Sequence, residues 1–146
     1  MNKVEQLNDL TLEVAGRNQL NYTFDIYPVG SSLSQSGGVY TLLFYDDLYD
    51  AWKIVYIGQT ENFRIRVCKA LKRHHKWQDI KNNNATHIGL LIIENRTLRL
   101  KVEEELISLH NPCCNKEYRI EDNHFKFPSF YGLFNLPELF GVAKVN

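Results

Sequence analysis

The residues best suited to chemistry are two tyrosines in apolar segments, one arginine in a basic segment, and one glutamate and one asparagine in the C-terminal half. They are Tyr40, Tyr56, Arg66, Glu103 and Asn115. A glutamate is a hard oxygen ligand for Mg²⁺ or Mn²⁺, and one carboxylate suffices for an ion that keeps several waters. An arginine fork can hold phosphate oxygens, and a tyrosine with a lowered pKa, or within a proton relay, can accept a proton from water. Hydrolysis of a phosphodiester needs groups of these kinds.

The first element expected around these residues is a β-hairpin. Two apolar, β-branched runs, residues 39–45 and 52–58, flank the polar residues 46–51. This pattern predicts two antiparallel strands joined by a turn longer than the two-residue type. Gly58 is expected to end the second strand.

Helices and a third strand are expected to follow the hairpin. Apolar residues at helical spacing predict one helix within 59–77, and a polar loop follows at 78–85. Residues 86–93 have the composition of a buried central strand. A second helix is predicted over 97–110, and Pro112 would end it. Its expected apolar face consists of Leu98, Val102, Leu106 and Leu109.

The predicted organisation is one α+β domain with extensions at both ends. Residues 1–36 form an N-terminal extension with a strand at 22–29, and the Ser- and Gly-rich residues 30–38 mark its boundary. The core, residues 37–117, is a three-stranded antiparallel sheet flanked by helices. The aromatic-rich C-terminal extension, residues 118–146, is expected to pack on this core.

Two tripeptides in the hairpin strands, Gly38-Val39-Tyr40 and Tyr56-Ile57-Gly58, resemble the signature of the GIY-YIG endonuclease family. Three further residues match the family at its usual distances. These are Arg66, ten residues after Tyr56; Glu103, in Glu103-Glu104-Glu105-Leu106-Ile107; and Asn115, in Asn111-Pro112-Cys113-Cys114-Asn115. The resemblance covers about residues 37–117.

The resemblance implies a metal-dependent endonuclease that hydrolyses DNA and leaves a 5′-phosphate and a 3′-hydroxyl. Glu103 would be the metal ligand, Tyr56 would orient water or phosphate, and Asn115 would brace the site. This sequence departs from the family at Ala70, where many members carry His or Tyr one turn after the arginine. His74 and His75 are the candidates to replace that residue.

Contacts to the nucleic acid are expected from the basic segment that follows the hairpin. Residues 64–76 contain six Lys or Arg and no acid, although the whole chain has a net charge of zero. The predicted nucleic-acid-binding residues are Gly58, Arg64, Lys69, Lys72, Arg73, His74 and Lys76. Aromatic residues of the C-terminal extension could stack on bases, but burial against the sheet is their more ordinary use.

Each candidate also has a simpler interpretation. Tyrosines in hairpins usually pack in a core, Arg66 alone would be a surface residue, and Asn115 alone would be a turn residue. Glu103 shares its run with Glu104 and Glu105, and such a run is ordinarily a solvated helix face. The joint pattern favours the catalytic interpretation.

Composition favours a globular, cytoplasmic protein without a membrane segment or secretion signal, and the three cysteines are expected to be free thiols. The preferred function is an endonuclease acting on double- or single-stranded DNA as a monomer or homodimer, of restriction or defence, mobile-element or repair type. One alternative is a catalytically weak or inactive nucleic-acid-binding module with the same fold. Another is an interaction protein that uses its aromatic tail.

Overall fold

The computed structural model describes residues 10–69, 71–115 and 142–145. Its elements are β1 (Thr11–Ala15), β2 (Asn21–Pro28), β3 (Gly38–Asp46), β4 (Ala51–Thr60), the π-helix η2 (Arg64–Lys69), the 3-10 helix η3 (Leu71–Arg73), α1 (Trp77–Asn82), β5 (His87–Ile92), α2 (Arg96–His110) and β6 (Val142–Val145). This arrangement confirms the α+β class. Of the predicted C-terminal extension, only β6 belongs to the described residues.

The strands form one curled antiparallel sheet that closes on itself in the order β1-β2-β5-β3-β4-β6. The three predicted strands are present as β3, β4 and β5, with β3 paired to both of the others. The sheet nevertheless has more strands than the three predicted. The strand β2, which was predicted within the N-terminal extension, pairs with β5 and also with β1. The sheet therefore continues into residues that the sequence assigned to an extension.

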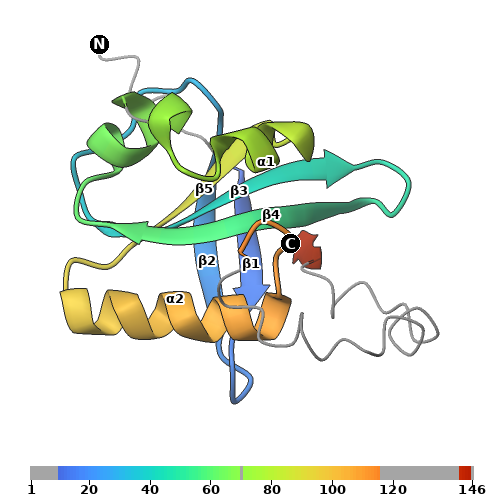
Figure 1. Ribbon diagram of the computed structural model, residues 1–146. Coiled ribbons are helices and arrows are strands. Elements are labelled where there is room, and N and C mark those ends of the chain that lie inside the picture. The colour runs from blue at the N-terminus through green and yellow to red at the C-terminus, as the bar shows by residue number, and fades with distance from the viewer. Residues whose placement is uncertain (1–9, 70, 116–141, 146) are drawn as a thin grey trace, which may run out of the picture.

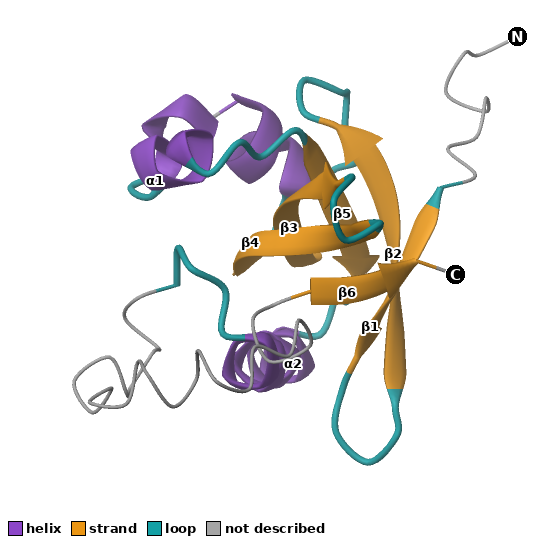
Figure 2. Cartoon of the chain, turned by 90° about the vertical axis from the view of Figure 1, so that its right-hand side faces the viewer, coloured by secondary structure: helices purple, strands orange, loops and turns teal. Residues whose placement is uncertain are grey.

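Helices cover the two faces of the sheet, and each face has its own hydrophobic core (Figures 1 and 2). On one face α2 packs against the sheet, and its Val102 and Leu106 join a cluster with Val39 and Ile57. On the other face η2, η3 and α1 cover a second cluster, which includes both candidate tyrosines. Because side chains alternate along a strand, Tyr40 and its neighbour Val39 point into different clusters.

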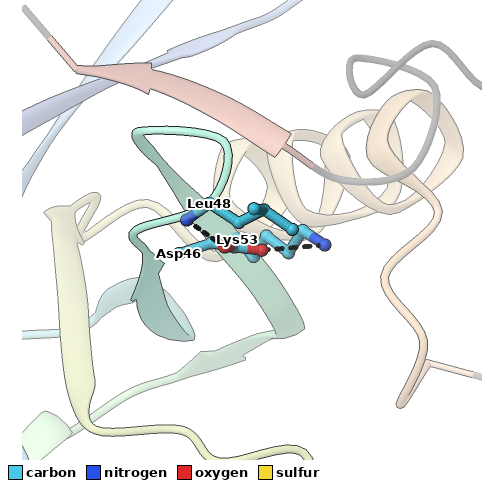
Figure 3. A network of polar contacts seen from close by, with 3 residues as sticks. All are labelled: Asp46, Leu48 and Lys53. Carbon is cyan, nitrogen blue, oxygen red and sulfur yellow. Dashed lines mark hydrogen bonds and ion pairs between the residues drawn. The ribbon is translucent and has the colours of Figure 1, made fainter.

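The β3–β4 hairpin has the long polar turn that its sequence predicts. Asp46 accepts a hydrogen bond from the Leu48 backbone N–H at 2.9 Å and pairs with Lys53 Nζ at 3.2 Å. Figure 3 draws these three residues and both contacts. These contacts hold the pKa of Asp46 below its usual value. Both strands extend further than expected, since Gly38 pairs with Thr60. The prediction that β4 ends at Gly58 was therefore wrong.

The single helix predicted over 59–77 is replaced by two short pieces, η2 and η3, and α1 begins only at Trp77. One physical cause is His74, whose Nδ1 accepts the Lys76 backbone N–H at 3.0 Å. That N–H is the donor a continuous helix would direct to a carbonyl one turn earlier. Helix α1 then occupies residues that the sequence assigned to the loop 78–85.

Helix α2 has nearly its predicted length, and its predicted apolar face is confirmed in part, because Val102 and Leu106 are buried. Leu98 is 51% exposed and Leu109 is 37% exposed, whereas Arg99 and His110 are buried. These two polar residues find partners inside, since Arg99 binds Gln59 and His110 binds the Ala15 carbonyl. A rule that buries only apolar residues therefore misses Arg99 and His110, and it wrongly buries Leu98 and Leu109.

The burial of His110 leads us to predict that the stability of the fold depends on pH. Its Nε2–H donates to the Ala15 carbonyl at 2.7 Å, and its Nδ1 is buried without a hydrogen-bond partner. Burial lowers the pKa of His110 below 6.5, so below that pH the unfolded chain takes up a proton that the folded chain resists. We expect the free energy of unfolding to fall as pH falls from about 7 to about 5. His110→Gln should weaken this dependence.

The measurement is the urea midpoint at each pH for wild type, His110→Gln and the control His75→Gln, whose side chain is exposed. His87, whose pKa is also lowered by burial, contributes in the same direction in all three proteins. An equally steep pH dependence in wild type and His110→Gln would refute the assignment.

Candidate active site

The two candidate tyrosines lie on one face of the β3–β4 hairpin. Tyr40 pairs directly with Gly58, and Tyr56 is two residues before Gly58, so both side chains project to the same side. Their ring centroids are 6.0 Å apart. Between them and the turn, one extra residue of β4, Val55, produces a β-bulge. The hairpin therefore brings the two tyrosines together although they are sixteen positions apart in the sequence.

Gly58 is buried directly beneath the Tyr40 hydroxyl. A Cβ atom added to Gly58 would lie 2.6 Å from both Cζ and Oη of Tyr40, and 2.9 Å from Cε1 of Tyr56. Only glycine leaves room for the phenol at this place. Gly58 was predicted as a nucleic-acid contact, but the structure places it in the interior, where it supports Tyr40.

The Tyr40 oxygen is surrounded by hydrogen-bond donors. It lies 3.0 Å from Nε2 of His74 and also receives side-chain hydrogen bonds from Arg66 and Tyr56. Burial raises the pKa of Tyr40 above 10.0, while the Arg66 charge and the hydrogen bonds from Arg66 and Tyr56 oppose that rise. The balance is a raised pKa, because the side chain is only 1% exposed.

His74 contacts both tyrosines from the connection between η3 and α1. Its ring packs edge-on against Tyr56 at 4.9 Å and stacks on His75 at 4.8 Å. Its Nδ1 accepts the Lys76 N–H, so neutral His74 carries its proton on Nε2 and donates it to the Tyr40 oxygen. His74 was predicted to contact nucleic acid, yet it is 3% exposed and lies beside the tyrosines.

Arg66 comes from η2 and is half-buried. An Asx-type cap begins this turn, because Asn62 Oδ1 accepts the Ile65 N–H at 3.1 Å and the Asn62 carbonyl accepts the Arg66 N–H. The Arg66 side chain hydrogen-bonds Tyr40 and also lines an open cleft of about 470 Å³. It therefore connects the buried phenol to solvent-accessible space.

The structure distinguishes the three consecutive glutamates of α2. Glu105 accepts hydrogen bonds from the Arg17 backbone N–H at 2.9 Å and from the Tyr22 hydroxyl at 3.3 Å, while Glu104 is exposed. Glu103 is half-buried and close enough to Tyr40 for its charge to raise the pKa of that phenol. Of the three glutamates, Glu103 is therefore the one whose charge acts on Tyr40. Its helix α2 and the turn η2 lie on opposite faces of the sheet.

Asn115 is buried against β4, beyond the two residues of that strand that pair with β6. Its Oδ1 accepts the Ile57 N–H at 2.8 Å and its Nδ2 donates to the Ile57 carbonyl at 2.7 Å, so the amide replaces a neighbouring strand. The adjacent Cys114 N–H donates to the carbonyl of the bulge residue Val55 at 2.9 Å. The exposed Cys113 and the buried Cys114 place their sulfur atoms 3.7 Å apart. Asn115 therefore fixes the backbone between Tyr56 and Gly58.

Of the remaining basic candidates, the structure describes the side chains of Arg64, Arg73 and Lys76. Arg64 is half-buried and its Nε donates to the Leu33 carbonyl at 3.0 Å. Arg73 is exposed, and Lys76 is half-buried. The side chains of Lys69 and Lys72 lie outside the part of the chain that the structure describes.

A divalent metal would have one protein carboxylate here. Within the described ranges, no three His, Cys, Asp or Glu side chains gather closely enough to hold a metal ion. Glu103 nonetheless fits an ion of the magnesium type, because such ions take few protein ligands and complete their shell with water and substrate oxygens. Its neighbour Glu105 is already engaged by Arg17 and Tyr22.

The chain matches no protein-family model, no curated protein and no solved structure. None of the helices in the described residues is long and apolar enough to span a membrane.

Proposed function

We propose that this chain is a metal-dependent DNA endonuclease of the GIY-YIG type. The observation that carries the proposal is the convergence of three donors, His74, Arg66 and Tyr56, on the oxygen of Tyr40. The positive charge of Arg66 and the hydrogen bonds from Arg66 and Tyr56 favour the phenolate, whereas burial of the side chain favours the neutral phenol and keeps the pKa of Tyr40 above 10.0. An ordinary core tyrosine needs only one partner.

In the proposed mechanism Tyr40 accepts the proton of the attacking water. Arg66, which contacts Tyr40 in the free chain, also reaches the cleft, so it can hold the non-bridging oxygens of a phosphate at that opening. His74 keeps its Nε2–H on the phenol oxygen because Lys76 occupies the other ring nitrogen. His74 thus acts as a positioning residue and stabilises the deprotonated phenol.

Glu103 would hold the Mg²⁺ or Mn²⁺ ion on the side of α2. When bound, such an ion neutralises charge on the phosphoryl group and assists the departing oxygen. Asn115 and Gly58 act on the shape of the site. Asn115 fixes the β4 backbone at Ile57, and Gly58 leaves space for the phenol.

The test is cleavage of plasmid and single-stranded DNA with Mg²⁺ or Mn²⁺ over a range of pH. Because burial raises the pKa of Tyr40 above 10.0, we expect the rate to rise with pH into the alkaline range. Arg66→Lys should lower the rate by roughly ten- to a hundredfold, because it keeps the charge but loses the planar fork. The matched control is Arg17→Lys, whose side chain is exposed and lies outside the cleft. Equal rates for the two variants would argue against the role of Arg66.

A binding module without efficient turnover is the second candidate. It is favoured by the near-complete burial of Tyr40, which leaves the phenol protonated at neutral pH. Salt-dependent DNA binding with no cleavage under either metal, at any pH, would support this function over the first.

A further inference from the structure

The cleft that Arg66 lines extends away from the tyrosines toward the beginning of α2. It lies where the end of β4, the start of η2 and the first turn of α2 meet. Its lining residues are Gln59, Thr60, Glu61, Asn62, Ile65, Arg66, Arg96 and Arg99. Three guanidinium groups therefore face one opening that contains a single carboxylate.

Arg99 is the most unusual of these residues, because it is only 2% exposed. Its Nε donates to Gln59 Oε1 at 2.8 Å, and its Nη1 donates to the carbonyls of Ile93 and Glu94 at 3.3 Å. All three acceptors are uncharged. Among the described residues, no carboxylate lies within ion-pair distance of Arg99. A buried charge is normally paired, so among the residues that the structure describes this site holds a fixed positive charge without its counterion.

The first turn of α2 adds to the positive potential. Asn95 caps the helix by accepting the Leu98 N–H, and the first turn contains no acidic residue. Helices usually favour acids at this end, because the backbone dipole is positive there. Here Arg96 occupies the first turn instead, and it is exposed. The start of α2 thus presents positive charge to the cleft from both backbone and side chain.

We propose that this cleft binds a second phosphate of the DNA strand, adjacent to the one held by Arg66. The inference rests on the proposed function for its choice of ligand. Arg99 supplies a fixed charge held by neutral partners, and Arg96 supplies an exposed one. The strand then crosses the sheet edge from the tyrosine site toward the beginning of α2. Glu61 opposes binding and limits its strength.

The test measures DNA binding without cleavage. Full-length chains carrying Glu103→Gln are mixed, in EDTA, with a short fluorescein-labelled single-stranded oligonucleotide, and anisotropy gives Kd over a series of KCl concentrations. Adding Arg96→Gln should weaken binding roughly three- to tenfold and reduce the slope of log Kd against log salt by about one. Adding Glu61→Gln should have the opposite effect and tighten binding.

The matched control is Lys101→Gln, an exposed basic residue on the same helix outside the cleft. Equal slopes for Arg96→Gln and Lys101→Gln would overturn the subsite, as would an oligonucleotide that does not bind at the lowest salt. Displacement by inorganic phosphate at an equal concentration of phosphate groups would show a free-anion site and overturn the strand subsite. These outcomes can be distinguished from a failure of the proposed reaction. If the chain never cleaves DNA but shows the expected slopes, the phosphate subsite is supported and only the nuclease proposal is refuted.

Discussion

Glu103→Gln is expected to lower the rate of DNA cleavage by at least about a thousandfold, whereas Glu104→Gln leaves the rate nearly unchanged. Glutamine keeps the size of the side chain but removes the charge that would hold a divalent ion. The loss of metal assistance amounts to several kcal/mol, and each 1.4 kcal/mol is about tenfold in rate. Glu104 is exposed and therefore serves as a control of equal charge on the same helix.

The third glutamate of the run allows a sharper comparison. Glu105 binds the Arg17 backbone and the Tyr22 hydroxyl, so Glu105→Gln should change stability more than rate. Single-turnover cleavage gives the rate, urea unfolding gives the stability, and calorimetric titration with Mn²⁺ gives metal affinity. If Glu103→Gln binds Mn²⁺ and cleaves DNA as wild type does, then Glu103 is not the metal ligand.

The strands around the site could be predicted well because their signals are local. The runs that contain Tyr40 and Tyr56 are apolar and β-branched, and a polar turn separates them, so hairpin pairing follows from the pattern alone. The strand His87–Ile92 is recognisable in the same way. The expectation that both tyrosines lie near Arg66 needed only this hairpin and the segment directly after it.

The contacts that the sequence hid are those between segments far apart in the chain. Nothing local reveals that His74 Nε2 lies 3.0 Å from the oxygen of Tyr40, which is 34 residues earlier in the chain. The burial of Arg99 depends on Gln59 and on two carbonyls in the segment before α2. Propensity and periodicity place Arg and His on the surface. These residues are buried here because the fold brings hydrogen-bond partners to them, and the sequence pattern does not show those partners.

Asn115 illustrates a role whose mechanism only the coordinates could give. Sequence resemblance suggested that its amide braces the site, without naming what it braces. The structure places both ends of the amide on Ile57, between Tyr56 and Gly58. An asparagine offers one acceptor and one donor at the spacing of a backbone strand, which aspartate or leucine cannot do.

Gly58→Ala should lower the cleavage rate by about 10²- to 10⁴-fold, the usual worth of a general base, although the substituted side chain carries no chemistry. The new methyl carbon would lie 2.6 Å from the Tyr40 hydroxyl oxygen, which must then leave His74 and Arg66. Gly58 does not have a positive φ, so alanine fits its backbone and the effect comes from the contact alone. Overpacking should also reduce stability by roughly 1–3 kcal/mol.

The control for that loss of stability is Gly89→Ala in β5, where a Cβ would lie 2.5 Å from Thr41 Oγ1. Thr41 is the neighbour of Tyr40 in β3, and its side chain therefore points to the other face of the sheet. Gly89→Ala should thus destabilise the fold comparably while sparing most of the rate. Combining Gly58→Ala with Tyr40→Leu should cost less stability than the sum of the single changes, because the smaller side chain makes room for the methyl group. Strict additivity, or equal rate losses for the two glycine variants, would mean that Gly58 does not act through Tyr40.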